Sequence, residues 1–134
     1  GYALCSAADV ANALQRVRTA FNANALVQAA ALAALDDAAH LEKVLTVCAT
    51  ERARLDSGLR ALGLQPMPTV TNFMSIPVPM KAAEVVARMQ EHGILIGAWS
   101  DGGRDDVIRI SIGGPDDTDA VLTAMKVILA RDVS

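Results

Sequence analysis

Apolar residues recur every three or four positions through the first half of the chain, which is the spacing of one face of an α-helix. Ser6 and Asp9 have the spacing of a capping pair for a first helix, and Asn24 can cap a second. A long apolar stripe ends just before Gly63, which we expect to close a third helix in a left-handed turn. The pattern therefore predicts helices at about residues 6–21, 25–36 and 38–62.

The second half alternates between the period of two that is typical of strands and the helical period. Strands are expected at residues 70–78, 94–99 and 107–112, and helices at residues 81–92 and from Pro115 onward. Pro77 restricts the first of these strands to an edge or a strand end, and Tyr2–Cys5 resembles the end of another strand. The elements together predict an α+β fold, in which a helical segment leads into a small antiparallel sheet covered by helices on one face.

Composition and charge narrow the possible functions of this 134-residue chain. Its net charge is -3 and it has no basic stripe, which argues against a nucleic-acid partner. No apolar run approaches the roughly 20 residues of a membrane-spanning helix, so no membrane association is expected. Two cysteines cannot form a disulfide framework, so we expect Cys5 and Cys48 to be small buried side chains of a cytoplasmic protein. The first residues lack an initiator methionine and a signal peptide's basic region, so we expect the chain to begin inside a longer protein.

Arg109 lies in the middle of the expected strand at residues 107–112 and needs an explanation. Period two places it on the face opposite Ile108 and Ile110. One explanation is a solvated outer face, which is where charged side chains usually lie. The other is a planar, permanently charged fork that holds a carboxylate in a cleft, a task for which arginine is better suited than lysine. Spacing alone leaves both open.

The remaining polar residues do not form a recognisable catalytic or metal-binding pattern. His40 and His92 have no Cys, Asp or Glu at ligand spacing, so a metal site is not expected. Asn72 can act as a cap or as a hydrogen-bond bridge behind a pocket. The three lysines are expected on polar helix faces or at a helix start, namely Lys43, Lys81 and Lys126. Composition and spacing alone therefore assign no catalytic residue to this chain.

Several short motifs nevertheless occur in a familiar order along almost the whole chain. They are Gly1-Tyr2-Ala3, residues 21–30 (FNANALVQAA), Glu51-Arg52, Thr71-Asn72-Phe73, residues 93–96 (GILI) and residues 108–113 (IRISIG). In this order and spacing the sequence resembles the C-terminal part of the histidinol-phosphate aminotransferases, which belong to the fold-type-I pyridoxal-phosphate enzymes.

The resemblance implies a division of the chain and a place in a larger enzyme. Residues 1–36 would be the end of the large-domain strand and the connecting helices, and residues 37–134 the long bridging helix and the small domain of a homodimeric transaminase. Pyridoxal 5'-phosphate (PLP) would be bound mainly by the upstream domain, where the family's cofactor-binding lysine also lies. By position, Arg109 matches the family arginine that binds the substrate α-carboxylate. The segment by itself is therefore expected to be inactive.

One departure from the family pattern concerns the substrate. After Gly-Ile-Leu-Ile the family often has an arginine that contacts the substrate phosphate, whereas this chain has Gly97. Arg104 is a candidate to take over that contact. An aromatic or other amino acid, recognised through apolar contacts around Trp99, is the alternative substrate. A non-catalytic amino-acid-binding regulatory module, in which Arg109 binds an effector, is the alternative of a different class.

Overall fold

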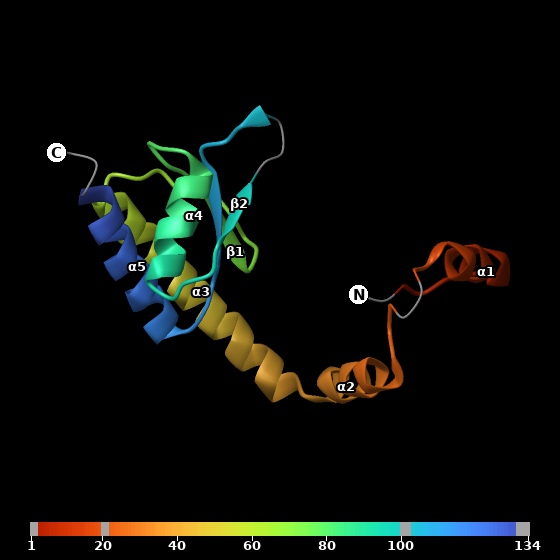
Figure 1. Ribbon diagram of the computed structural model, residues 1–134. Coiled ribbons are helices and arrows are strands. Elements are labelled where there is room, and N and C mark those ends of the chain that lie inside the picture. Colours follow the sequence, from red (N-terminus) through yellow and green to blue (C-terminus); the bar gives the residue numbers. More distant parts are fainter. Residues whose placement is uncertain (1–2, 20–21, 100–102, 131–134) are drawn as a thin grey trace. The chain divides into compact units, whose positions relative to one another are not determined.

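The computed structural model describes residues 3–19, 22–99 and 103–130 (Figure 1). The chain divides into two units, Gly1–His40 and Leu41–Ser134.

The first unit contains α1 (Ala8–Val17) and α2 (Ala25–Asp36). The side chain of Asn24 accepts a hydrogen bond of 3.0 Å from the amide of Val27, so the expected cap of α2 is confirmed. The capping pair expected for α1 is wrong, because the N-cap position is Ala7 and no side chain caps it. Residues 3–5 do not form a strand. The helix α1 also ends at Val17, earlier than expected, and Phe21 itself lies outside the described residues. Neither helix contains a buried residue.

The long helix α3 (Ala38–Ala61) matches the expected range to within one residue. Its end is set by Gly63, whose positive φ of 85° allows the chain to reverse without a side-chain clash. The amide of Leu64 donates to the carbonyl of Leu59 over 3.1 Å, which gives a hydrogen-bond partner to one of the carbonyls at the end of the helix. Its buried residues are Glu51, Leu55 and Leu59.

A three-stranded antiparallel sheet forms the centre of the second unit. Its strands are β1 (Phe73–Pro77), β2 (Gly97–Trp99) and β3 (Val107–Ser111), in the order β1-β3-β2. The strand with Pro77 is therefore at an edge, as expected. All three strands are shorter than their patterns predicted.

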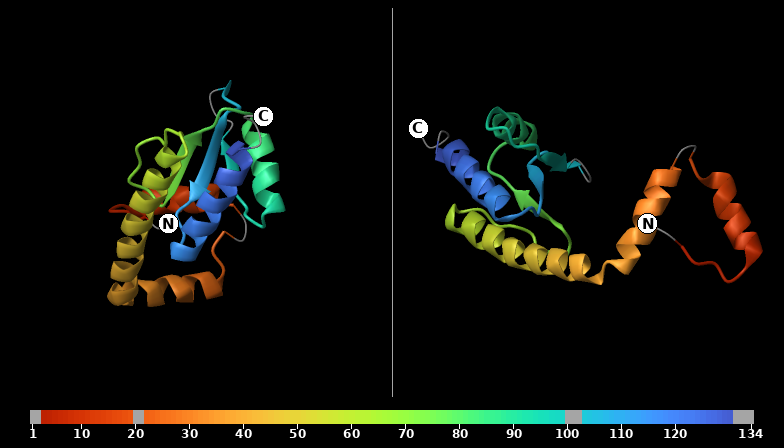
Figure 2. Two further views of the ribbon diagram at one scale, coloured as in Figure 1. Left: turned by 90° about the vertical axis from the view of Figure 1, so that its left-hand side faces the viewer. Right: turned by 90° about the horizontal axis from the view of Figure 1, so that it is seen from below.

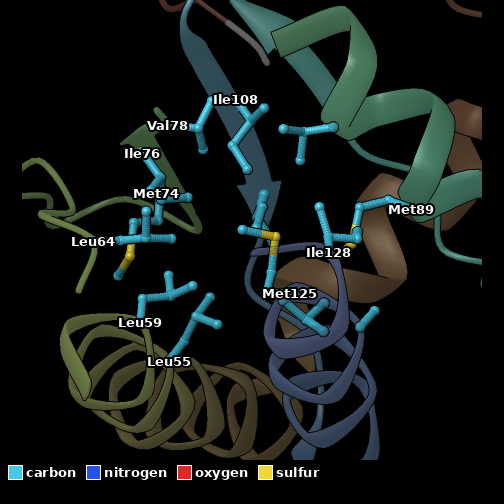
Figure 3. Packing of buried hydrophobic residues seen from close by; sticks show 14 of the residues in the cluster. Leu55, Leu59, Leu64, Met74, Ile76, Val78, Met89, Ile108, Met125 and Ile128 are labelled. Carbon is cyan, nitrogen blue, oxygen red and sulfur yellow. The ribbon is translucent and has the colours of Figure 1, made fainter. Parts of the chain in front are cut away.

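Three helices cover one face of this sheet, as Figure 2 shows: α3, α4 (Ala82–Glu91) and α5 (Pro115–Ala130). Leu55 and Leu59 of α3, Met89 of α4, and Met125 and Ile128 of α5 point toward the strands (Figure 3). The strands contribute Met74, Ile76, Ile108 and Ile110, each at most 2% exposed. The α+β fold with one covered face is thus confirmed, and the opposite face is left open for other contacts.

The expectation of two buried cysteines is wrong. Cys5 is exposed and Cys48 is half-buried, and both are free thiols. Cys5 lies ahead of α1, a helix without buried residues, so no described residue of its unit covers it. Among the described residues, no helix has the length and apolar character needed to cross a membrane.

Candidate functional site

Arg109 is at the centre of the open face of the sheet. The neighbouring residues of β3, Ile108 and Ile110, are in the core on the helix-covered side, so strand alternation directs Arg109 the other way. Its partners across the two ladders are Ser75 of β1 and Gly97 of β2. The side chain is exposed, and its backbone is held on both sides by neighbouring strands.

The guanidinium of Arg109 contacts an aromatic ring instead of a carboxylate. Its Cζ lies 3.9 Å from the centroid of the Phe73 ring, a distance at which the positive charge is attracted to the negative face of the ring. Within the part of the chain that the structure describes, Arg109 makes no ion pair. Its N–H donors thus remain available to an incoming anion.

A shallow hollow of about 250 Å³ lies beside Arg109 on this face. It is lined by Leu95, Ile96, Gly97, Arg109 and Ser111. The hollow combines an apolar wall, a hydroxyl and one permanent positive charge. Such an arrangement suits a small anion attached to an organic group.

Gly97 keeps the space next to Arg109 open. A Cβ built on Gly97 would lie 4.0 Å from the Cβ of Arg109, which is ordinary contact. Because directly paired residues of antiparallel strands point to the same face, a longer side chain at position 97 would lie beside the guanidinium. Among the described residues, the glycine therefore leaves a single arginine on this part of the face.

Arg104, the second arginine considered from the sequence, is engaged elsewhere. Its Nε donates to Asp106 Oδ1 over 2.8 Å and its Nη2 donates to Asp106 Oδ2 over 2.7 Å, a two-pronged ion pair. These side-chain hydrogen bonds raise the pKa of Arg104 and lower the pKa of the Asp106 carboxyl from its usual value. No described contact joins Arg104 to Arg109.

Asn72 is an exposed residue immediately before β1. Its carbonyl accepts a hydrogen bond of 2.8 Å from the amide of Ile112, which extends the pairing of β1 with β3 by one step. Among the described contacts, Asn72 is therefore a backbone link and is not joined to the hollow.

Sequence reasoning missed Phe73 as a member of the site. The residue lies opposite Ser111, and Arg109 is two positions from Ser111 on the same strand face. An aromatic residue and a cationic residue that are diagonal neighbours on two paired strands are within reach of each other. The signal was not readable from the sequence, because it depends on the register between two strands that are distant in the chain.

The described residues do not form a site for a carbonyl cofactor such as PLP, which needs a lysine at its reactive carbon. Lys81 and Lys126 belong to the helix layer on the opposite side of the sheet, and Lys43 is in the exposed first part of α3. None of the three lines the hollow beside Arg109. The hollow beside Arg109 therefore suits an anion and has no lysine in its lining.

Comparison with known proteins gives the class. The family model for aminotransferases of class I and II matches residues 1–125. The chain therefore belongs to the class I and II aminotransferase family, of which PLP is the cofactor.

Individual relatives carry a narrower name. The chain is 35% identical over 129 residues to histidinol-phosphate aminotransferase 1 of Mesorhizobium japonicum, a match that covers 96% of the chain and 35% of that relative. It is 38% identical to histidinol-phosphate aminotransferase 2 of Pseudomonas aeruginosa, covering 98% of the chain and 36% of the relative. The chain thus spans about a third of the length of these curated relatives.

A solved structure agrees with these matches. The crystal structure of histidinol-phosphate aminotransferase from Sinorhizobium meliloti in complex with pyridoxal-5'-phosphate aligns with a TM-score of 0.79 and 29% identity. The alignment covers 94% of this chain and 35% of that one.

Proposed function

We propose that this chain is the C-terminal segment of a PLP-dependent aminotransferase that acts on histidinol phosphate. Its division into the end of a large domain with connecting helices (residues 1–36) and a bridging helix with a small domain (residues 37–134) belongs to the same proposal. The support is a family match that covers helices and sheet alike and the shared name of the relatives. The family match includes the leading helices, which a free-standing regulatory module would not need, so it disfavours that alternative.

The proposed reaction transfers the amino group of histidinol phosphate to 2-oxoglutarate, giving imidazole acetol phosphate and glutamate, in histidine biosynthesis. The names of the relatives support this substrate. One observation favours the alternative, an aromatic or other amino acid: Gly97 leaves Arg109 as the single arginine on its part of the open face. Trp99, at 37% exposure in the same strand as Gly97, offers an apolar surface to such a substrate.

Arg109 is the residue that carries this proposal. Its fork, over Phe73 and beside the hollow, would bind the α-carboxylate of 2-oxoglutarate or glutamate through two parallel hydrogen bonds, since histidinol phosphate itself has no carboxylate. Holding one end of the substrate fixes where its amino group and its Cα–H bond lie, which lowers the entropic part of the barrier. When bound by the complete protein, PLP would supply the electron sink for the reaction.

Arg104 and Asn72 have secondary places in the proposal. Arg104 would contact a substrate phosphate only after releasing Asp106, an exchange that costs little because both side chains are solvent-accessible. Asn72 would support the site by tying the start of β1 to the end of β3. We further propose that the complete protein is a cytoplasmic homodimer.

The test uses the full-length enzyme with Arg109→Gln and Arg109→Lys. Loss of a charge-assisted two-pronged contact of about 1.5–3 kcal/mol should lower kcat/KM for amino-acid substrates about 10- to 150-fold in Arg109→Gln. Arg109→Lys keeps the positive charge and loses the forked geometry, so its kcat/KM should lie between those of the wild-type enzyme and Arg109→Gln. Wild-type kcat/KM in Arg109→Gln, with PLP content unchanged, would remove Arg109 from the site.

The substrate is decided by profiling the same full-length enzyme. We expect histidinol phosphate to have a higher kcat/KM than phenylalanine or tyrosine. The reverse order would establish the aromatic alternative. The isolated 134-residue chain with added PLP serves as the control, and we expect it to show no turnover.

A further inference from the structure

We propose that Phe73 is a positioning residue for anion binding, because its ring holds the Arg109 guanidinium at the hollow before the substrate arrives. This inference rests on the proposed function of Arg109 and adds to it the residue that sets the geometry of the fork. Phe73 does not touch the substrate in this proposal and acts through Arg109.

The contact between the two side chains follows from the sheet register. Phe73 pairs with Ser111 and Ser75 pairs with Arg109, so Phe73 and Arg109 are diagonal neighbours on the open face. The Cζ of Arg109 lies 3.9 Å from the ring centroid, close enough for a cation–π interaction. A ring face attracts the charge without supplying an oxygen acceptor, so the fork is held and its donors stay available to an anion.

The start of β1 is fixed more firmly than an ordinary edge strand. The carbonyl of Phe73 accepts hydrogen bonds from the hydroxyls of Thr69 and Thr71, each at 3.1 Å. Nη1 of Arg52, in α3, donates to the carbonyl of Thr71 over 2.9 Å. The backbone under the ring is therefore tied both to its own turn and to the helix layer.

A fixed ring under a long side chain has a direct consequence for binding. A free arginine has many rotamers and loses that freedom when it grips a ligand, which weakens binding. The contact with Phe73 removes part of the freedom beforehand, so less is lost when the anion binds. An aliphatic side chain of similar size would fill the same space without attracting the guanidinium.

The experiment compares Phe73→Leu and Phe73→Tyr in the full-length enzyme loaded with PLP, with glutamate as the carboxylate substrate. Phe73→Leu should raise KM for glutamate about three- to tenfold, the range of a partly exposed cation–π contact, with kcat within about twofold. Phe73→Tyr keeps the ring face and should retain the wild-type KM. Phe73→Met is the second aliphatic variant should Phe73→Leu fail to fold, and the same rise is expected.

A double-mutant cycle separates positioning from general stability. In the Arg109→Gln background the guanidinium is gone, so Phe73→Leu should change kcat/KM by less than about twofold. An equal loss in both backgrounds, or an unchanged KM in Phe73→Leu, would overturn the proposal. Should Arg109→Gln itself leave kcat/KM unchanged, the proposed function of Arg109 fails as well. A loss in Arg109→Gln without one in Phe73→Leu removes only the role of Phe73.

Discussion

At the scale of single residues, Arg104 and Arg109 differ in what occupies their donors. Arg104 is bound through two hydrogen bonds to Asp106, whereas Arg109 lies over a ring at the edge of a hollow. An anion competing for Arg104 must displace a carboxylate, and one binding at Arg109 has no described competitor to displace. The two arginines therefore have the same charge, but the N–H donors of Arg109 are more available to an incoming anion than those of Arg104.

This difference predicts an order of effects. In the full-length enzyme, Arg104→Ala should raise the KM for histidinol phosphate by less than about threefold, since exposed ion-pairing side chains contribute little. Arg109→Gln should lower kcat/KM for glutamate, the carboxylate substrate, at least about tenfold. Steady-state kinetics of both variants under one set of conditions measures the order. A larger effect for Arg104→Ala would make Arg104 the main contact of the substrate phosphate.

The same ion pair predicts a pH dependence. The hydrogen bonds from Arg104 lower the pKa of Asp106 in the folded protein, so the unfolded chain binds the proton more tightly. The stabilisation is therefore present above the unfolded pKa of about 4 and is lost as the pH falls through the lowered folded value. Asp106→Asn should lower Tm slightly at pH 7, and the difference should disappear in acid. A difference in Tm that persists at pH 2–3 would contradict this assignment.

At the scale of elements, α3 and α5 approach each other closely at Gly58. A Cβ at this position would lie 2.5 Å from Cδ1 and 2.6 Å from Cδ2 of Leu122, so the leucine side chain would have to move. Gly58→Ala gains about 0.5–1 kcal/mol from helix propensity, and overpacking costs about 1–3 kcal/mol. We expect a net loss of about 1 kcal/mol in the free energy of unfolding.

The Leu122→Ala background provides the control for this prediction. With the leucine shortened, Gly58→Ala should become stabilising, because the propensity gain remains and the clash is gone. Denaturant unfolding of the wild type, Gly58→Ala, Leu122→Ala and the double variant gives the coupling free energy between the two positions. The absence of a sign change would mean that the helices adjust their separation instead.

A row of charged side chains also links α3 to α5. Glu51 is only 3% exposed, and its Oε2 accepts a hydrogen bond of 2.8 Å from Nη1 of Arg54, which also pairs with Asp119 of α5. Arg54→Met leaves the Glu51 carboxylate buried without its cation and should cost about 2–4 kcal/mol of unfolding free energy. Asp119→Ala removes the exposed end alone and should cost less than about 1 kcal/mol. Chemical denaturation that found equal costs would show that Glu51 is not the sensitive member.

How well each element could be predicted depended on whether its signals were local. The end of α3 was expected to within one residue, because Gly63 is the cap itself. The strands were overestimated, because alternation continues into residues whose backbone is bound otherwise. Thr71, for example, lies before β1: its amide donates to the Thr69 hydroxyl and its carbonyl accepts from Arg52. The position of Arg109 on the face opposite Ile108 and Ile110 was predicted from strand parity, whereas its contact with Phe73 requires a register that no local pattern encodes.

At the scale of the whole molecule, the core and the leading helices differ in kind. Among the residues that the structure describes, the large buried side chains all belong to Leu41–Ser134, whereas α1 and α2 contain no buried residue. Apolar side chains of these two helices remain exposed, including Val17 at 78% and Leu26 at 81%. Burial of apolar surface is the dominant stabilising contribution in folding, so the second unit has its own source of stability and the first does not.

A shortened chain tests this difference. Residues 38–134, which keep all of α3, should unfold cooperatively with a free energy within about 1 kcal/mol of the 134-residue chain, because no core contact is removed. Hydrogen exchange of the longer chain should show fast exchange in α1 and α2 and strong protection in β3 and α5, since an isolated short helix is only marginally stable in water. The exposed apolar side chains should also make the longer chain self-associate more than the shorter one. Strong protection of α1 and α2 in a monomer would mean that the leading helices find a partner within the chain itself.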